Sequence, residues 1–130
     1  MSHAAAKKRT VLILDDHPSV AETLGLVLSS SGYDVHSADS VPEAIQSART
    51  MSFDLLVTEV VLDGQSGIDA AIEIRKFLPH CKVLLMSGNT ATGELLRRAQ
   101  ESGQLFDFLP KPIHPTVILE KLKLMSEGSN

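Results

Sequence analysis

Polar side chains stand at the ends of the apolar runs in this chain. Asp15 and Asp16 follow the first run, Glu59 closes the third, Ser87 closes the fourth, and Lys111 comes just after the fifth. Carboxylates that lie close together repel one another, and a hard divalent cation relieves that repulsion. An all-oxygen ligand set with few protein carboxylates suits Mg²⁺ or Mn²⁺. These residue types predict a cation site with a hydroxyl and an ammonium group beside it, provided that the fold brings them together.

The apolar runs alternate with segments of helical periodicity. Unbroken apolar runs are typical of strands covered on both faces, and they lie at 11–14, 55–57 and 83–86. Shorter or weaker strands are predicted at 33–37 and 106–109. Helices are predicted from Pro18 to Gly32, over 41–48 behind a Ser40 cap, from residue 68, around 95–99, and from Pro115 to Met125.

This alternation predicts one α/β domain over residues 10–125, with a lead-in over 1–9 and a frayed tail over 126–130. The five strands would form a doubly wound parallel sheet in the order 2-1-3-4-5, with helices on both faces. Ligands bind such sheets at the carboxyl ends of the strands, where the strand order reverses. That point lies between the first and third strands, so we expect Asp15, Asp16 and Glu59 to converge.

Composition limits the classes of function. Of the 130 residues, 43% are hydrophobic and 22% charged, which is the balance of a globular domain rather than a disordered one. The net charge of −4 gives no sign of a nucleic-acid surface. Cys81 is the single cysteine, so neither an internal disulfide nor a cysteine zinc cluster can form. With no signal-peptide core and no apolar run of membrane-spanning length, we expect a cytoplasmic protein that contacts neither membrane nor nucleic acid directly.

Each residue of the acidic site also has an ordinary structural explanation. Asp15 and Asp16 could end a strand and cap a helix, and Ser87 could be a simple strand-end residue. Lys111 could be a solvated lysine, although the prolines on either side of it fix the backbone. Their shared position at the carboxyl edge of one sheet favours a site over these separate explanations.

Five segments in order resemble the receiver domain of two-component response regulators. They are 12–18 (Leu-Ile-Leu-Asp-Asp-His-Pro), 54–59 (Asp-Leu-Leu-Val-Thr-Glu), 62–67 (Leu-Asp-Gly-Gln-Ser-Gly), 85–88 (Leu-Met-Ser-Gly) and 108–112 (Phe-Leu-Pro-Lys-Pro). Each segment alone is weak, whereas the set is specific and spans essentially residues 10–125. The resemblance implies a flavodoxin-like fold and Mg²⁺-dependent acceptance of a phosphoryl group from a sensor histidine kinase or a phosphotransfer protein.

The resemblance also implies roles at the reacting centre. Asp15 and Asp16 match the acidic pair that holds the metal, and Glu59 stands at the phosphoacceptor position. Ser87 matches the hydroxyl residue that contacts the phosphoryl oxygens, and Lys111 matches the lysine that pairs with them.

Two further positions match family features outside this centre. Phe108 matches the aromatic switch residue, and Val61 would offer its backbone carbonyl to the metal. The resemblance also makes the bond before Pro112 a candidate cis peptide, because proline makes the cis form accessible.

Glu59 departs from the family, which has aspartate there. Its carboxylate reaches roughly one bond length further, and a misplacement of about 1 Å costs on the order of 10²-fold in a positioned reaction. Three accounts stay open: a natural atypical receiver that works through partners, a carboxylate that partly imitates the phosphorylated state, or a substitution made to imitate that state. Asp63 is a disfavoured substitute acceptor, because a turn with Gly64 explains it.

The sequence thus favours a signalling module over a turnover enzyme. Its output would be a two-state change in the face formed by the fourth helix, fifth strand and fifth helix. This face would serve a downstream protein, a missing output domain or a homodimer. The alternative is a phosphorylation-independent interaction module. A phosphohydrolase with an aspartyl nucleophile is disfavoured, because it requires Asp-x-Asp where this chain has Asp15-Asp16-His17.

Overall fold

The computed structural model describes residues 8–88, 93, 97, 100, 101, 103 and 106–127. Its main sheet has five parallel strands in the order β2-β1-β3-β6-β7. The strands are β1 (Thr10–Leu14), β2 (Asp34–Ala38), β3 (Leu55–Glu59), β6 (Lys82–Ser87) and β7 (Asp107–Pro110). The predicted order 2-1-3-4-5 is confirmed, because the higher labels of the last two strands only reflect two short strands that lie between β3 and β6 in the chain.

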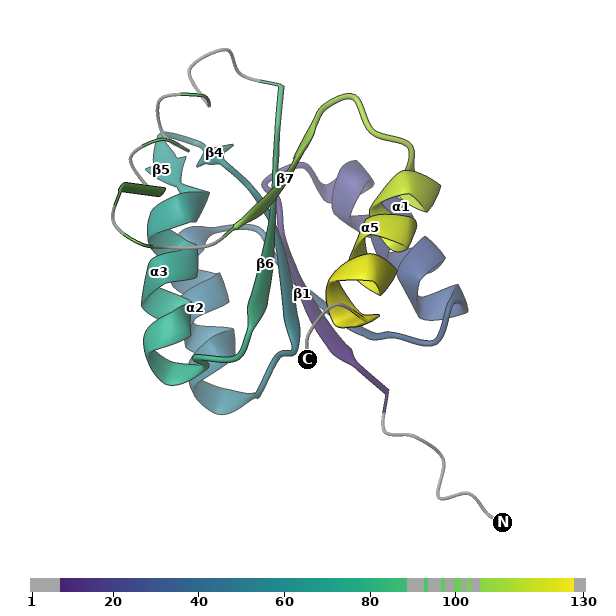
Figure 1. Ribbon diagram of the computed structural model, residues 1–130, viewed down its shortest axis with the longest axis horizontal. Helices are drawn as coiled ribbons and strands as arrows, with labels where there is room; N and C mark the ends of the chain where they lie inside the picture. Colours follow the sequence, from purple (N-terminus) through teal and green to yellow (C-terminus); the bar gives the residue numbers. More distant parts are fainter. Residues whose placement is uncertain are drawn as a thin grey trace.

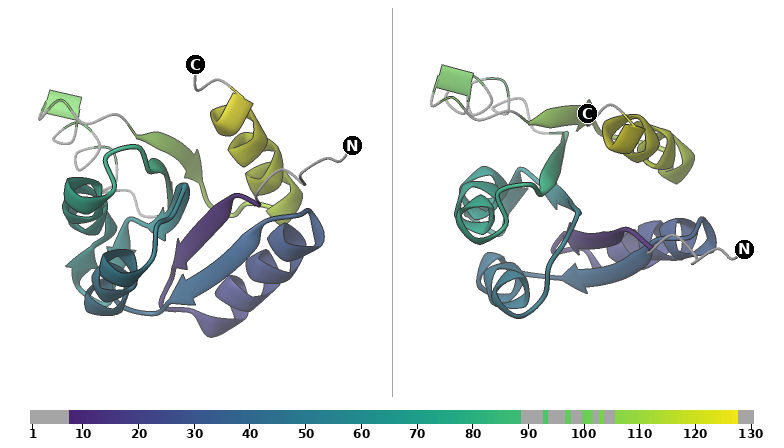
Figure 2. Two further views of the ribbon diagram at one scale, coloured as in Figure 1. Left: turned by 90° about the horizontal axis from the view of Figure 1, so that it is seen from below. Right: turned by 60° about the horizontal axis from the view of Figure 1, so that its bottom comes forward.

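Helices cover both faces of this sheet. Helices α2 (Val41–Thr50) and α3 (Gly67–Phe77) lie on one face, and α1 (Pro18–Ser30) and α5 (Pro115–Glu127) lie on the other (Figure 1). The two further views in Figure 2 show the same separation by the sheet. Alternate strand residues therefore point into two different cores: Leu12 and Leu56 into the core under α2 and α3, Val11 and Leu55 into the core under α1 and α5.

Local sequence explains where the helices begin and end. Pro18 occupies the first turn of α1, and Gly32 follows its end at a φ of +97°, a conformation that glycine adopts at little cost. The predicted Ser40 cap of α2 is confirmed, since its Oγ accepts a hydrogen bond from the Glu43 amide at 3.3 Å. Ser66 caps α3 in the same way, accepting from the amide of Asp69 at 3.2 Å.

Several predicted boundaries differ from the structure. Tyr33 lies outside β2 because its amide donates to the carbonyl of Leu28, which makes it part of the turn that ends α1. Helix α5 continues to Glu127, whereas a tail was predicted from residue 126. Lys82 stabilises this last turn, donating from Nζ to the carbonyl oxygen of Met125 at 2.6 Å. The helix predicted around 95–99 falls mostly outside the described residues, as do 1–7 of the lead-in and 128–130 of the tail.

A small antiparallel pair was not predicted. Strands β4 (Val61–Leu62) and β5 (Gln65–Ser66) form a two-stranded sheet between β3 and α3. Asp63 and Gly64 connect them, with φ values of +44° and +80°. The prediction that a turn accounts for Asp63 is confirmed. Among the described helices, none combines the length and apolar character needed to cross a bilayer.

Candidate metal and phosphoryl site

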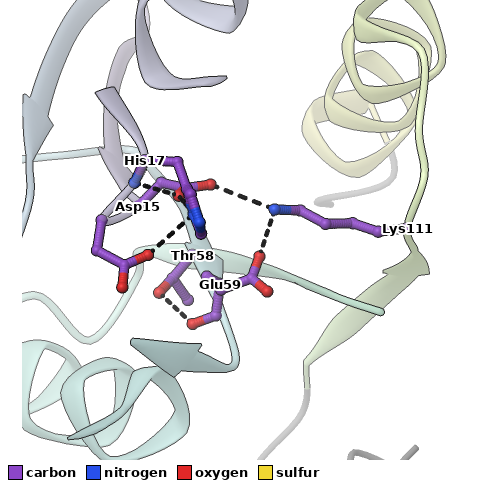
Figure 3. A network of polar contacts seen from close by, with 6 residues as sticks. Asp15, His17, Thr58, Glu59 and Lys111 are labelled. Carbon is purple, nitrogen blue, oxygen red and sulfur yellow. Dashed lines mark hydrogen bonds and ion pairs between the residues drawn. The ribbon is translucent and has the colours of Figure 1, made fainter. Parts of the chain in front are cut away.

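Asp15 is the central acid of the site. It follows β1 directly and is fully buried, and its amide is held by the carbonyl of Ala38 at 3.2 Å. Its two carboxylate oxygens face different partners: Oδ1 accepts from the backbone amide of His17 at 2.9 Å, and Oδ2 accepts from Nζ of Lys111 at 3.4 Å (Figure 3). A buried carboxylate held in this way keeps its orientation without help from solvent.

Glu59 ends β3 and points toward the same ammonium group. Its Oε2 lies 2.7 Å from Nζ of Lys111, so this lysine bridges Asp15 and Glu59 (Figure 3). The predicted convergence of the first and third strand ends is therefore confirmed for these two acids. The carboxyl edge of the sheet holds an acid–lysine–acid arrangement from three chain segments that are distant in sequence.

Burial and charge act on both partners of this ion pair. Burial raises the pKa of Glu59, the charges of Asp15 and Asp16 raise it further, and contact with Lys111 opposes them without cancelling them. Burial lowers the pKa of Lys111, but contact with Glu59 and the charge of Asp15 outweigh burial, so its pKa lies above the ordinary value. Glu59 thus resists ionisation in this position, whereas Lys111 holds its proton tightly.

The backbone explains why Lys111 reaches the acids. It follows β7 directly, and the Lys111–Pro112 peptide is cis, which confirms the sequence prediction. Its amide donates to the carbonyl of Ser87 at 3.0 Å, which places the lysine next to the end of β6. Ser87 is buried there, opposite Pro110 in the sheet register. The predicted hydroxyl residue therefore neighbours the predicted lysine through a direct backbone contact.

Asp16 and His17 complete the acidic side. Nδ1 of His17 lies 3.2 Å from Oδ1 of Asp15 and 3.1 Å from Oδ1 of Asp16. Sequence reasoning noted the Asp15-Asp16-His17 motif without assigning a role to the histidine. Its adjacency to two acids was the available signal, but only the structure shows that its ring turns toward both of them.

The donor set fits a divalent cation. One ligand atom from each of Asp15, Asp16 and His17 lies within 4.8 Å of the others. Oδ1 of Asp16 is buried, and although Nδ1 of His17 lies 3.1 Å from it, no described residue donates a well-directed hydrogen bond to it. A poorly satisfied buried acceptor costs free energy, and a cation bound there would supply the missing interaction.

The two remaining predicted positions lie at the border of the site. Val61 belongs to β4, two residues after Glu59, and pairs with Ser66. Phe108 belongs to β7 and packs, partly buried, against the core under α2 and α3. Val61 follows Glu59 by two residues and Phe108 precedes Lys111 by three, and their roles in metal binding and switching stay predictions.

Gly67 shapes the end of β3, which sequence reasoning did not anticipate. Its amide donates to the carbonyl of Val60 at 2.7 Å, so the start of α3 lies directly against this strand. A Cβ atom at residue 67 would overlap the carbonyl oxygen of Glu59. Only glycine allows this approach, which positions the backbone that carries Glu59.

Comparison with known proteins gives a consistent family match. Residues 11–123 match the response regulator receiver domain family. The transcriptional activator protein ExaE of Pseudomonas putida is 32% identical over 120 residues, which cover 91% of this chain and 55% of that protein. The transcriptional regulatory protein GlrR of Escherichia coli K12 is 28% identical over 122 residues, covering 94% and 26%. The chain thus spans between about a quarter and just over half of these relatives.

Solved structures agree with the fold. A receiver domain protein (CheY-like) from Methanospirillum hungatei superposes with a TM-score of 0.84 at 21% identity, covering 93% of this chain and 95% of that one. The response regulator protein TrrA from Thermotoga maritima, solved in complex with Mg²⁺-BeF, superposes with a TM-score of 0.74 at 26% identity. That match covers 88% of this chain and 96% of TrrA.

Proposed function

Because this chain belongs to the response regulator receiver domain family, we propose that it transmits a phosphorylation-type signal with Glu59 at the phosphoacceptor position. The observation that carries the proposal is the bridging position of Lys111, 2.7 Å from Glu59 and 3.4 Å from the buried Asp15. A charge change at Glu59 acts directly on this ammonium group. A sensor histidine kinase or a phosphotransfer protein would supply the phosphoryl group.

Each residue of the site would have its own role in phosphoryl transfer. Asp15 and Asp16, with Glu59 and the backbone carbonyl of Val61, would hold Mg²⁺, which when bound neutralises charge on the phosphoryl oxygens. The position of Lys111 allows its ammonium group to neutralise another of these oxygens, and Ser87 would donate its hydroxyl to a third. The chain's contribution is positioning and charge, because this transfer needs little covalent help from the protein.

A conformational change that begins at the site would be transmitted to β7 and α5. Lys111 lies between these two elements, and its backbone is tied to the end of β6. A new charge at Glu59 would change the balance that holds Lys111, and Phe108 in β7 would change its packing in response. The face formed by β7, α5 and the helix expected around 95–99 would then engage an output domain, a protein partner or a second copy of the chain.

Phosphorylation by a small donor tests this proposal. Wild-type protein, Glu59→Asp and Glu59→Gln are incubated with Mg²⁺ and acetyl phosphate, and the intact mass is followed over time. Glu59→Asp is expected to gain one phosphoryl group, and the wild type to gain one at Glu59 on the order of 10²-fold more slowly, because of its displaced carboxylate. Glu59→Gln is the control, since its amide cannot accept the group.

Two results would contradict parts of the proposal. If Glu59→Asp is phosphorylated and the protein with Glu59 is not, the acceptor role of Glu59 is wrong and this chain acts as an interaction module without phosphorylation. If neither protein gains a phosphoryl group, Asp15, Ser87 and Lys111 do not form a working transfer site. Intact folding of each variant is checked by circular dichroism.

A further inference from the structure

The imidazole of His17 has a position that the proposed phosphoryl chemistry does not use. Its Nδ1 lies almost equally far from two carboxylate oxygens, 3.2 Å from Asp15 Oδ1 and 3.1 Å from Asp16 Oδ1. The ring is 68% exposed, so packing does not hold it there. Polar contacts with the two acids, together with the backbone contact from the His17 amide to Asp15, determine where it lies.

A single hydrogen on Nδ1 cannot satisfy both acids. The ring forms its hydrogen bond with Asp15 Oδ1, whereas Oδ1 of Asp16 is buried and accepts no hydrogen bond from a described residue. A metal ion placed among the three atoms would contact all of them at once. Neighbouring ligands at about 2.1 Å from one ion are separated by roughly 3 Å in octahedral geometry, which is close to the two nitrogen–oxygen distances in this structure.

The lysine leaves this side of the site accessible. Lys111 contacts Asp15 through Oδ2, whereas His17 contacts the same carboxylate through Oδ1. An ion bound between Oδ1 of Asp15 and His17 would therefore not require removal of the ammonium group from Oδ2. Figure 3 shows His17 and Lys111 approaching Asp15 from different directions.

We propose that His17 is a further ligand of the cation site, beside Asp15 and Asp16, and that it makes the site favour a transition-metal dication, such as Co²⁺ or Zn²⁺, over Mg²⁺. Imidazole nitrogen suits first-row transition metals, whereas Mg²⁺ prefers oxygen ligands. Coordination uses the tautomer that carries its hydrogen on Nε2, and the exposed edge of the ring leaves that hydrogen facing solvent. This inference rests on the cation site of the proposed function and adds its metal preference.

Metal titrations of the untagged protein test the inference. Co²⁺ binding is followed by its visible absorption and Mg²⁺ binding by calorimetry, in the wild type and in His17→Asn. Asparagine keeps a polar group near the position of Nδ1 but removes the imidazole. The variant is expected to bind Co²⁺ at least about tenfold more weakly and to change its Mg²⁺ affinity by less than about twofold. His80→Asn, an exposed histidine elsewhere on the surface, is the matched control and is expected to bind as the wild type does.

A structural readout separates ligation from an indirect effect. In ¹⁵N-labelled protein, Zn²⁺ is expected to shift the Nδ1 resonance of His17 and to leave that of His80 unchanged. Equal Co²⁺ affinity in the wild type and His17→Asn would overturn the inference and leave the Mg²⁺ site intact. Tighter binding of both ions by His17→Asn would also overturn it, because the ring would then occupy the place of the ion. If the wild type binds none of these ions, the inference and the proposed metal site both fail.

Discussion

Two lysines from the region of the last strand and helix form ion pairs, and they do so in different surroundings. At the carboxyl end of the sheet, Lys111 pairs with Glu59 at 2.7 Å, with side chains only 25% and 12% exposed. At the amino end, Lys121 of α5 pairs with Asp107 of β7 at 3.2 Å, with side chains 32% and 47% exposed. Water screens the second pair, so it stabilises little, whereas the charges of the first interact strongly.

The difference in burial between the two ion pairs distinguishes a functional site from a surface contact better than the nitrogen–oxygen distance of either pair does. Both lysines come from the β7–α5 region, and both make ordinary ion pairs. Of the two, only Lys111 has a second carboxylate partner, the fully buried Asp15. Burial lowers the pKa of Lys111, but contact with Glu59 and the charge of Asp15 raise it above its ordinary value. Strongly interacting charges at the carboxyl end of a parallel sheet are typical of a functional centre.

The largest expected effect is a loss of stability when Lys111 is replaced, and replacement of Lys121 is the comparison. Lys111→Met leaves the buried Asp15 and the partly buried Glu59 without their shared cation, and we expect it to lower the free energy of unfolding by about 2–3 kcal/mol at neutral pH. Lys121→Met removes a solvated pair and should cost less than about 1 kcal/mol. Urea denaturation followed by circular dichroism measures both values. Equal losses in the two variants would show that the burial difference has no energetic consequence.

The metal ion provides the next test of the same contrast. Mg²⁺ at ten times its dissociation constant should stabilise the folded chain by about 1.4 kcal/mol, and chelation with EDTA should remove that gain. Asp15→Asn is expected to abolish the stabilisation, because the buried ligand is lost. Asp107→Asn, at the amino end, should keep it. Thermal denaturation with and without Mg²⁺ measures the shift, and a loss of response in both variants would contradict a localised site.

A smaller effect should appear as a pH dependence. Because the pKa of Glu59 is raised, the folded state binds its proton more tightly than the unfolded state does. Glu59 therefore costs stability progressively as pH rises above its ordinary pKa of 4.5. Glu59→Gln lacks this titration, so its stability relative to the wild type should increase between pH 4 and 7.

Denaturation at several pH values measures the difference between Glu59→Gln and the wild type. The raised pKa of Lys111 acts in another range, since its contribution is complete below pH 10.5 and is lost above it. The slope expected between pH 4 and 7 thus belongs to Glu59. If the difference in the free energy of unfolding between the two proteins stays constant across this range, burial does not raise the pKa of Glu59.

The sequence predicts the site where chain direction alone determines position. Glu59 ends a strand, and Asp15 and Lys111 each directly follow one. Parallel strands bring their carboxyl ends to one edge, so convergence follows from topology. The same reasoning fails for His17, because its place depends on how one turn orients an exposed ring toward two carboxylates. Strand topology also does not predict that Lys111 bridges two acids rather than contacting one, because this depends on the length and direction of the lysine side chain.

Short strands, and contacts between residues far apart in the sequence, could not be predicted from the sequence for a different reason. Strands of two residues, as in β4 and β5, show no periodicity that a pattern could detect. The close approach of Gly67 to Glu59 depends on how α3 packs against β3, and a glycine at the start of a helix gives no sign of which backbone it faces. The contact from Lys82 to the carbonyl of Met125 joins residues 43 positions apart, so it depends on tertiary packing alone.

The smallest expected effect comes from replacing Lys82, which lies at the amino end of the sheet, as the Lys121–Asp107 pair does. Nζ of Lys82 donates to the carbonyl of Met125 at 2.6 Å, where the last turn of α5 leaves carbonyl groups without helical partners. We expect Lys82→Met to cost about 0.5–1 kcal/mol and to increase amide hydrogen exchange at the end of α5, with Mg²⁺ binding unchanged. Lys123→Met, on the exposed side of the same helix, is the control. If Lys82→Met altered metal binding, the amino end would be coupled to the site, and the division between a structural end and a functional end would be wrong.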